Sequence, residues 1–141
     1  MIGGRGVRKP RSEATLSTLE RSDDEDYELL AHRRTPLTVP AGDVIFRQGD
    51  QADGMYLVRE GSVALKEDDR VVETIAAPGL FGEMALIEDE PRSLLAVAQT
   101  DDSLIEIPTQ RFWVLVHETP CFARLVMRVM SERLRRRGLP T

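Results

Sequence analysis

Short strand-like segments separated by turn residues fill the middle of this 141-residue chain. Branched, aliphatic and aromatic residues recur there in short runs, at 37–39, 44–46, 55–58, 63–65, 71–75, 94–98 and 104–107. Turn residues divide the runs, among them Ala41-Gly42-Asp43, Gln48-Gly49-Asp50 and Glu60-Gly61-Ser62. Many short strands at this spacing are typical of an antiparallel sandwich or barrel. We therefore expect a mainly β domain, an antiparallel jelly roll (double-stranded β-helix), over about residues 37–108.

The spacing of the apolar residues becomes helical after Pro108. Thr109 is a suitable N-cap for a first helix, and a second helix is expected to begin near Pro120. The second helix carries one apolar stripe, formed by Phe122, Leu125, Val126, Val129, Met130 and Leu134. Arginines lie opposite the stripe (Arg124, Arg128, Arg135) or crowd the last turns (Arg133, Arg136, Arg137), where cations suit the helix dipole. These C-terminal helices should span about residues 109–137.

The first 26 residues differ from the rest of the chain. Their charge changes from basic to acidic, and few large apolar residues lie between the two halves. Such a segment cannot bury enough surface to offset the entropy of ordering it, so we predict a disordered tail over residues 1–26. It would be either an interaction tail or a solvated leader. The folded domain would then span residues 27–141, with one helical turn placing Tyr27 and Leu30 on its body.

Composition excludes several classes of protein. The formal net charge of -5 argues against a general nucleic-acid binder, which would normally be basic. No run of apolar residues is long enough to span a membrane or to serve as a secretion signal. The single cysteine, Cys121, cannot form an intramolecular disulfide and suits a reducing compartment. We therefore expect one globular domain in the cytoplasm.

One short loop between strands concentrates groups that bind phosphate. It reads Phe81-Gly82-Glu83-Met84-Ala85-Leu86 and is followed by Pro91-Arg92-Ser93. A glycine entering a helix N-terminus offers unhindered N–H groups to an anion, and an arginine grips two phosphate oxygens at once. Glu83 could accept a hydrogen bond from a neighbouring sugar hydroxyl. The loop therefore predicts a pocket for a small phosphorylated sugar.

These residues resemble the phosphate-binding cassette of cyclic nucleotide-binding domains. That family includes catabolite-activator-type transcription factors, kinase regulatory subunits and nucleotide-gated channels. The segments 40–50 and 55–61 and the closing helices are also similar, so the resemblance covers about residues 37–137. It implies that the chain binds cyclic AMP, or alternatively cyclic GMP, and needs no cofactor or metal. The candidate ligand-binding residues are Phe81, Gly82, Glu83, Met84, Ala85, Arg92 and Ser93.

The resemblance also implies a role for most of these residues. Gly82 and the amides of the three residues after it would line the phosphate. Glu83 would accept from the ribose 2′-hydroxyl, and Arg92 would pair with the exocyclic phosphate oxygens. Ser93 would add a hydroxyl or amide contact. The helix from about Pro120 would cover the base as a lid.

Leu94 departs from the family pattern, which usually has alanine at this position. Strand alternation places Leu94 on the same face as Arg92. The larger side chain either crowds the ribose phosphate or packs into the core without consequence. A domain that keeps the fold but binds no ligand, and acts as a protein-interaction module, is therefore the alternative function. In that case Arg92 could pair with Glu83 alone and hold the loop closed.

The sequence gives less information about how such a domain would pass its signal to other molecules. No helix-turn-helix follows the terminal helix, so direct DNA binding is not expected, and we expect a stand-alone sensor. It would signal by movement of the lid helix, hinged near Glu118-Thr119-Pro120, to an effector protein of unknown identity or to a second copy paired through that helix. A metal enzyme of the same architecture is disfavoured, because His32 and His117 are not at ligand spacing. Ser93 has no histidine partner in the sequence, so we expect no enzymatic activity.

Overall fold

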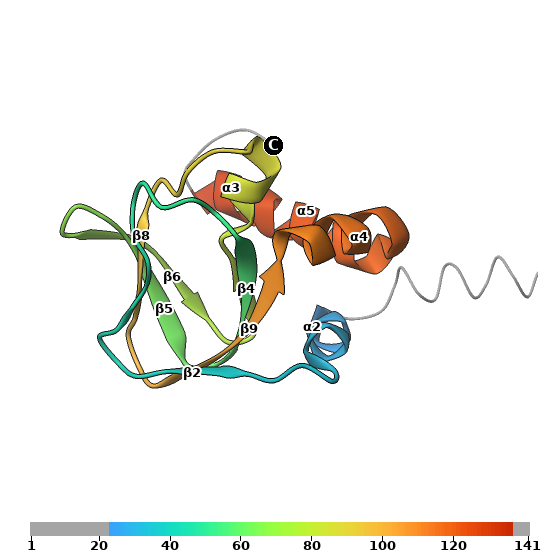
Figure 1. Ribbon diagram of the computed structural model, residues 1–141, viewed down its shortest axis with the longest axis horizontal. Coiled ribbons are helices and arrows are strands. Elements are labelled where there is room, and N and C mark those ends of the chain that lie inside the picture. Colours follow the sequence, from blue (N-terminus) through green and yellow to red (C-terminus); the bar gives the residue numbers. More distant parts are fainter. Residues whose placement is uncertain (1–22, 137–141) are drawn as a thin grey trace, which may run out of the picture.

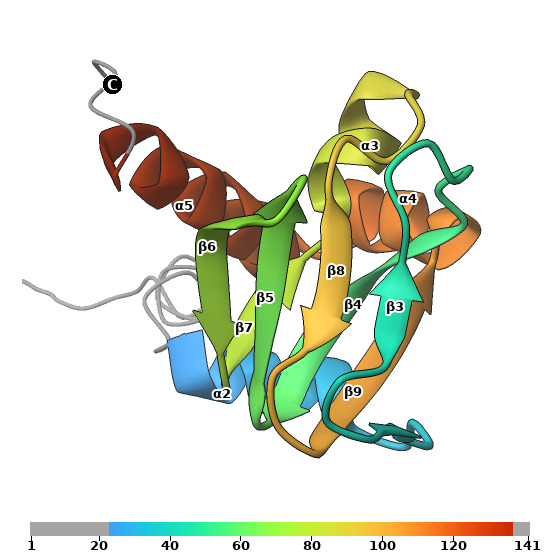
Figure 2. The same cartoon turned by 90° about the vertical axis from the view of Figure 1, so that its left-hand side faces the viewer.

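The computed structural model describes residues 23–136. Two four-stranded sheets form a barrel, and the N-terminal and C-terminal helices lie on the same side of it, beside the first sheet (Figures 1 and 2). The first sheet has the order β2-β9-β4-β7, with bounds Leu37–Val39, Asp102–Pro108, Gly54–Glu60 and Gly79–Phe81. The second has the order β3-β8-β5-β6, with bounds Val44–Phe46, Leu95–Ala98, Ser62–Glu67 and Arg70–Ala76. Every strand pair is antiparallel, which confirms the mainly β jelly-roll fold.

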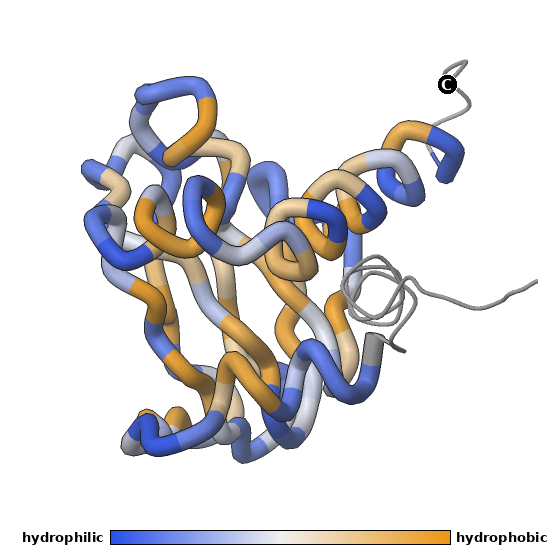
Figure 3. Tube along the Cα trace, turned by 90° about the vertical axis from the view of Figure 1, so that its right-hand side faces the viewer, coloured by the Kyte–Doolittle hydropathy of each residue, from blue (hydrophilic) through white to orange (hydrophobic). Residues whose placement is uncertain are grey.

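Strand alternation divides the core into two parts. Successive side chains of a strand point to opposite faces, and the central strands β4 and β9 bury both of theirs. Leu57 and Ile105 face the helices, where they join Phe112, Phe122 and other apolar residues of a first cluster. Their neighbours Val58 and Leu104 belong to a second cluster between the two sheets. Figure 3 shows apolar colours in stretches along the strands and polar colours in many of the turns that join them.

Three helices gather at one end of the barrel: α3 (Glu83–Glu88), α4 (Thr109–Glu118) and α5 (Pro120–Arg136). Figure 2 shows them at the top of the view, with α2 at the bottom. The buried side of α5 carries Phe122, Leu125 and Val126, which pack in the first cluster as the predicted stripe requires. None of the helices in the described range 23–136 is long and apolar enough to cross a membrane.

Several local boundaries differ from the predicted ones. Pro108, not Thr109, is the N-cap of α4, because its extended backbone ends β9 and leaves Thr109 as the first helical residue. The Thr109 N–H instead donates to the Asp53 carbonyl at 3.0 Å. Strand β7 was not predicted as a strand, although all three of its residues are buried and pair with β4.

The N-terminal helix α2 spans Asp23–Ala31. It therefore begins within the segment that the sequence assigns to a tail, and residues 1–22 lie outside the described part of the chain. Tyr27 and Leu30 are partly buried against the first cluster, as expected for a helix that docks on the body of the domain. Its apolar contacts explain why the acidic residues at its start are helical.

Candidate functional site

A cavity of about 290 Å³ opens between the second sheet, α3 and α5. Six of the seven predicted residues line it: Gly82, Glu83, Met84, Ala85, Arg92 and Ser93. The barrel adds Phe46, Leu65 and Glu73, and α5 adds Arg133. The structure thus brings together two segments of the predicted loop and three charged residues, Glu73, Glu88 and Arg133, that were not predicted as site residues.

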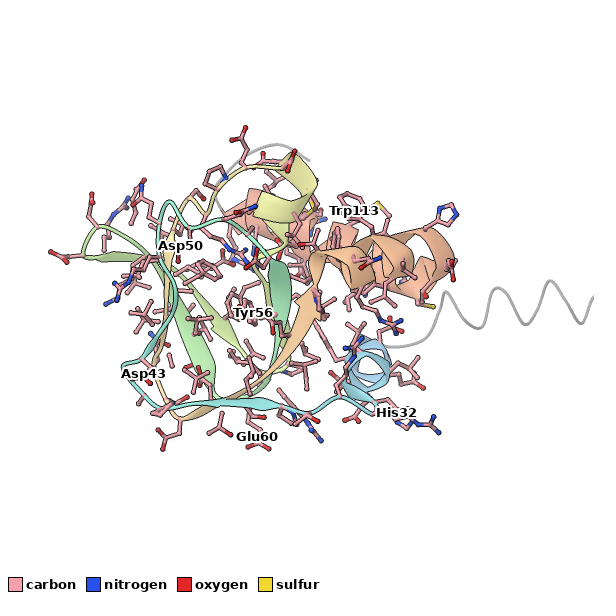
Figure 4. All side chains as sticks on the ribbon, in the orientation of Figure 1. His32, Asp43, Asp50, Tyr56, Glu60 and Trp113 are labelled. Carbon is pink, nitrogen blue, oxygen red and sulfur yellow. The ribbon has the colours of Figure 1, made fainter. Side chains whose placement is uncertain are left out.

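Phe81 is the predicted site residue that does not line this cavity. Its side chain is fully buried in the second cluster. The ring stacks on Tyr56 with centroids 5.2 Å apart and an interplanar angle of 19°. Figure 4 labels Tyr56 in the interior of the barrel. Phe81 therefore supports the site from the core side, because β7 directs its side chain away from the cavity.

Gly82 joins β7 to α3 in a conformation that favours glycine. Its φ of +86° lies in the left-handed region, and it is the N-cap of α3 without a side-chain capping bond. A Cβ atom at this position would lie 2.9 Å from Nη1 of Arg92. Glycine is thus needed both for the backbone turn and for the close approach of the arginine.

The guanidinium of Arg92 is held inside the protein, where only 5% of the residue is exposed. Nη1 donates to the carbonyl of Gly82 at 2.6 Å, and Nη2 donates to the carbonyl of Gly54. Nε has no hydrogen-bond partner in the described structure. Burial lowers the pKa of Arg92 below its ordinary value, and nearby Tyr56 and Asp53 oppose that shift. An arginine remains charged at neutral pH, so the site contains a fixed cation whose Nε–H is unused.

Aromatic rings complete the surroundings of this cation. Phe46 lies under the guanidinium and is 6.0 Å from the Phe81 ring, centroid to centroid. Burial, followed by the negative charge of Glu106, raises the pKa of Tyr56 above its ordinary value of 10.0. Tyr56 therefore stays neutral at physiological pH, and the cluster presents ring faces rather than a counter-ion to Arg92.

Glu83 is a carboxyl group with no exposed surface. Oε2 accepts a hydrogen bond from Nη1 of Arg133, and Oε1 has no partner within residues 23–136. Burial raises the pKa of Glu83 above its ordinary value of 4.5, and Arg133 partly offsets the shift. No ion pair joins Glu83 to Arg92 within the described residues. Glu83 pairs with Arg133, and Arg92 donates to the carbonyl of Gly82. The loop is therefore not closed by the Arg92–Glu83 pair that the sequence allowed.

Arg133 lines the cavity, but the sequence did not predict it as a site residue. It comes from α5, and only 9% of it is exposed. The sequence placed it among arginines that suit the helix dipole. Its spacing held another signal, because it lies four residues after Val129 and seven after Val126, in line with the apolar stripe. A charged residue at such a position must find a buried partner.

The position of Leu94, where the family usually has alanine, agrees in part with both interpretations of that difference. It lines the cavity beside Arg92 and Ser93, and it also packs against the second cluster. Strand β8 begins one residue later, at Leu95, so regular alternation does not set the direction of the Leu94 side chain. Leu94 therefore forms part of the cavity wall from a position just before the regular strand.

Two of the residues that line this cavity have a buried polar atom with no hydrogen-bond partner in the described range 23–136: Nε of the Arg92 cation and Oε1 of the Glu83 carboxyl. An unsatisfied polar atom is costly in a protein interior, so such atoms indicate groups that bind a partner. An anion next to Arg92 with a hydroxyl next to Glu83 would satisfy both.

Comparison with known proteins points to the same chemistry. The family model described as cyclic nucleotide-binding domain matches residues 36–119. A cyclic nucleotide-gated potassium channel of Rhizobium etli is 39% identical over 70% of this chain and 27% of its own length. A cAMP-dependent protein kinase regulatory subunit of Eremothecium gossypii is 39% identical over 56% of this chain and 17% of its own length.

The fold also matches a solved structure. The crystal structure of the Thermus thermophilus catabolite activator protein superimposes with a TM-score of 0.70 and 28% identity. The match covers 86% of this chain and 59% of that one. The chain therefore spans about a quarter or less of the length of the channel and kinase-subunit relatives and just over half of the activator. Because the family model covers more than half of the chain and encloses the cavity loop, the chain belongs to the cyclic nucleotide-binding domain family.

Proposed function

We propose that this domain binds cyclic AMP in the cavity between the second sheet, α3 and α5, and acts as a regulatory sensor rather than an enzyme. One observation carries the proposal: two residues that line the same cavity each have a buried polar atom without a partner among residues 23–136, Nε of Arg92 and Oε1 of Glu83. A cyclic nucleotide presents an anionic phosphate next to a ribose 2′-hydroxyl. The phosphate matches the charged donor of Arg92, and the hydroxyl matches the acceptor of Glu83.

The charge of Arg92 supports a negatively charged ligand, although three glutamates, Glu73, Glu83 and Glu88, also line the cavity. Arg92 is a fixed cation, and it would place its unused N–H toward a phosphate oxygen. The left-handed turn at Gly82 leaves the phosphate side without a Cβ atom. Met84, Ala85 and Ser93 would complete the lining on the α3 side, and Leu65 and Leu94 offer apolar surface to the sugar or base.

Cyclic AMP is proposed in preference to cyclic GMP because several similar proteins are named for cyclic AMP. The relatives include cAMP-dependent kinase regulatory subunits and a cyclic AMP receptor protein of Thermus thermophilus, which is 32% identical over 71% of this chain. Those names describe the relatives, and no residue in the cavity separates adenine from guanine. Cyclic GMP is therefore the second nucleotide to be measured.

The signal would leave the domain through α5. This helix is joined to α4 only by Thr119, and it supplies Arg133 to the cavity. Ligand binding would shift the equilibrium between positions of α5, and an effector protein or a second copy would respond to that shift. Direct DNA binding is not part of the proposal.

The test is isothermal titration of the purified chain with cyclic AMP and cyclic GMP. We expect saturable binding that weakens on the order of tenfold or more in Arg92→Ala, because an anion loses its charged partner. Arg59→Ala is the matched control, since Arg59 is exposed and lies outside the cavity. Absence of binding by the folded wild-type chain would reject the proposal and favour the ligand-free interaction module.

A further inference from the structure

We propose that a basic segment of this chain, residues 5–11, docks in a groove between α3 and α4 of its own domain. The sequence left two interpretations of the first residues open, an interaction tail and a solvated leader, and the groove favours the interaction tail. Of its lining residues, only Ala85 also lines the nucleotide cavity, so the proposal does not rest on the proposed function.

The groove has a volume of about 580 Å³ and is lined by α3, the start of α4 and the loop before β4. Ile87 of α3 and Trp113 of α4 line it, although 38% and 45% of their surfaces are exposed. Figure 4 labels Trp113 at the end of the molecule where α3 and α4 lie. Large apolar side chains that share one exposed groove indicate an interaction site.

A hydroxyl in the same groove indicates what kind of molecule would fit. Thr109 lines the groove, and its Oγ1 is buried without a hydrogen-bond partner within residues 23–136. A buried hydroxyl without a partner is costly, so an occupant that bonds to it is stabilised. Every residue of a peptide other than proline offers both an N–H donor and a C=O acceptor for this bond. The hydroxyl therefore favours a segment of polypeptide.

The charge of the groove selects a basic segment. Asp89 and Glu90 line it, and no lysine, arginine or histidine of the described residues does. Neither acid makes an ion pair within the described part of the chain. The indole ring is also the aromatic group that attracts cations most strongly. Two carboxylates and the face of Trp113 thus suit arginine and lysine side chains.

Such a segment precedes the domain in the sequence. Residues 1–22 contain five lysines and arginines against two glutamates, whereas the whole chain contains 19 basic residues against 24 acidic ones. Four of the five cations lie within residues 5–11, with Val7 and Pro10 as apolar neighbours. A segment tethered to its binding site has an effective concentration on the order of millimolar, so weak contacts suffice.

The length of the connection allows the segment to reach the groove. Helices α2 and α4 both contact α5 and β4, and they lie on the same side of the barrel (Figure 1). The chain between Arg11 and Asp23 spans up to about 40 Å when extended, more than the roughly 30 Å diameter of a small domain. The basic residues can therefore reach Trp113 of their own domain.

The experiment uses Trp113, the only tryptophan of the chain, as a fluorescent reporter. Acrylamide, an uncharged quencher, is titrated into the full chain without nucleotide. Reversing the four cations should raise the quenching constant about twofold, because like charges no longer hold the segment over the ring. Salt at about 1 M should have the same effect on the wild type, since it screens exposed charges. The variant combines Arg5→Glu, Arg8→Glu, Lys9→Glu and Arg11→Glu.

A second variant changes the groove instead of the segment. Asp89→Asn with Glu90→Lys should raise quenching like the first variant, and asparagine suits the left-handed backbone of Asp89, with its φ of +54°. Combining both sets of changes should lower quenching again, because the charges are then exchanged. The matched control is Glu118→Lys with Glu132→Lys, two exposed acids outside the groove, and it should keep the wild-type quenching constant.

Three results would overturn the proposal, provided that circular dichroism shows every variant to be folded. Unchanged quenching after reversal of the four cations shows that the segment does not cover Trp113. A rise in the Glu118→Lys, Glu132→Lys control equal to that of the groove variant shows that the overall charge, not the groove, is responsible. Wild-type quenching that increases on dilution assigns the groove to a second copy of the chain.

Discussion

The guanidinium carbon of Arg92 lies 4.0 Å from the centroid of the Phe46 ring. Phe46 ends β3 and is almost fully buried, so the cation rests on a ring face inside the protein rather than against a carboxylate. A cation over an aromatic face is attracted without being neutralised. Phe46 can therefore orient Arg92 and leave its full charge for an incoming anion.

We predict that Phe46→Leu weakens binding of cyclic AMP about three- to tenfold, the size of a cation–π contact at a largely buried site. Phe46→Tyr keeps a ring face under Arg92 and should bind within about twofold of the wild type. Isothermal titration of both variants measures the effect. Equal losses in the leucine and tyrosine variants would show that core packing, not the ring face, is responsible.

Gly82→Ala tests the turn that brings Arg92 to the cavity. The substitution places a side chain in the left-handed region, at a cost of about 1–2 kcal/mol in free energy of unfolding, and brings Cβ to 2.9 Å from Nη1 of Arg92. Gly42→Ala is a matched control, because Gly42 has a φ of +91° and open space around its Cβ position. We expect urea denaturation to show similar destabilisation for both variants, and titration to show a large loss of nucleotide affinity only for Gly82→Ala. A comparable loss of affinity in Gly42→Ala would mean that general destabilisation is the cause.

The pKa of Glu83 predicts a dependence of stability on pH. Burial raises this pKa above 4.5, so the folded protein holds the Glu83 proton more tightly than the unfolded chain does. The resulting contribution to stability is fully present below pH 4.5 and is lost as the pH rises through the folded-state pKa. The difference in free energy of unfolding between wild type and Glu83→Gln should therefore fall as the pH rises above 4.5, measured by urea denaturation at a series of pH values.

A second variant tests the cause of this shift. Arg133 lowers the pKa of Glu83, so in Arg133→Met the loss of stability should extend to higher pH and become larger. An Arg133→Met protein with the wild-type pH profile would show that the two side chains do not interact in solution.

The periodicity of the sequence was sufficient to predict most of the fold. Short apolar runs bounded by turn residues marked β4, β5, β6 and β9, and one helical stripe marked α5, because burial of one or both faces imposes these patterns. Strand β7 was missed because it contains only two apolar residues, Leu80 and Phe81, between two glycines, a pattern typical of a loop. The cap of α4 was misplaced because a proline with extended backbone took the N-cap in place of Thr109.

The site was predicted less completely, and the reason is the same for each omission. Gly82, Glu83 and Arg92 lie in one loop, where local chemistry is visible in the sequence. Glu73 and Arg133 meet across 60 residues, and only the packing of α5 on the barrel brings them together. Phe81 belongs to the same loop as Gly82, but strand direction turns its side chain into the core.

Leu94 decides between the two readings of the departure from the family pattern. Its side chain is half-buried and packs against the second cluster while it lines the cavity. We expect Leu94→Ala to lower the free energy of unfolding by about 1–2 kcal/mol, because part of its buried apolar surface is lost. The affinity for cyclic AMP should stay within about threefold of the wild type, since Arg92, Gly82 and Glu83 keep their contacts. Urea denaturation and titration of the same preparation measure both quantities. A gain in affinity of tenfold or more would instead mean that Leu94 crowds the ribose phosphate, and that this chain binds its nucleotide less tightly than its cavity chemistry allows.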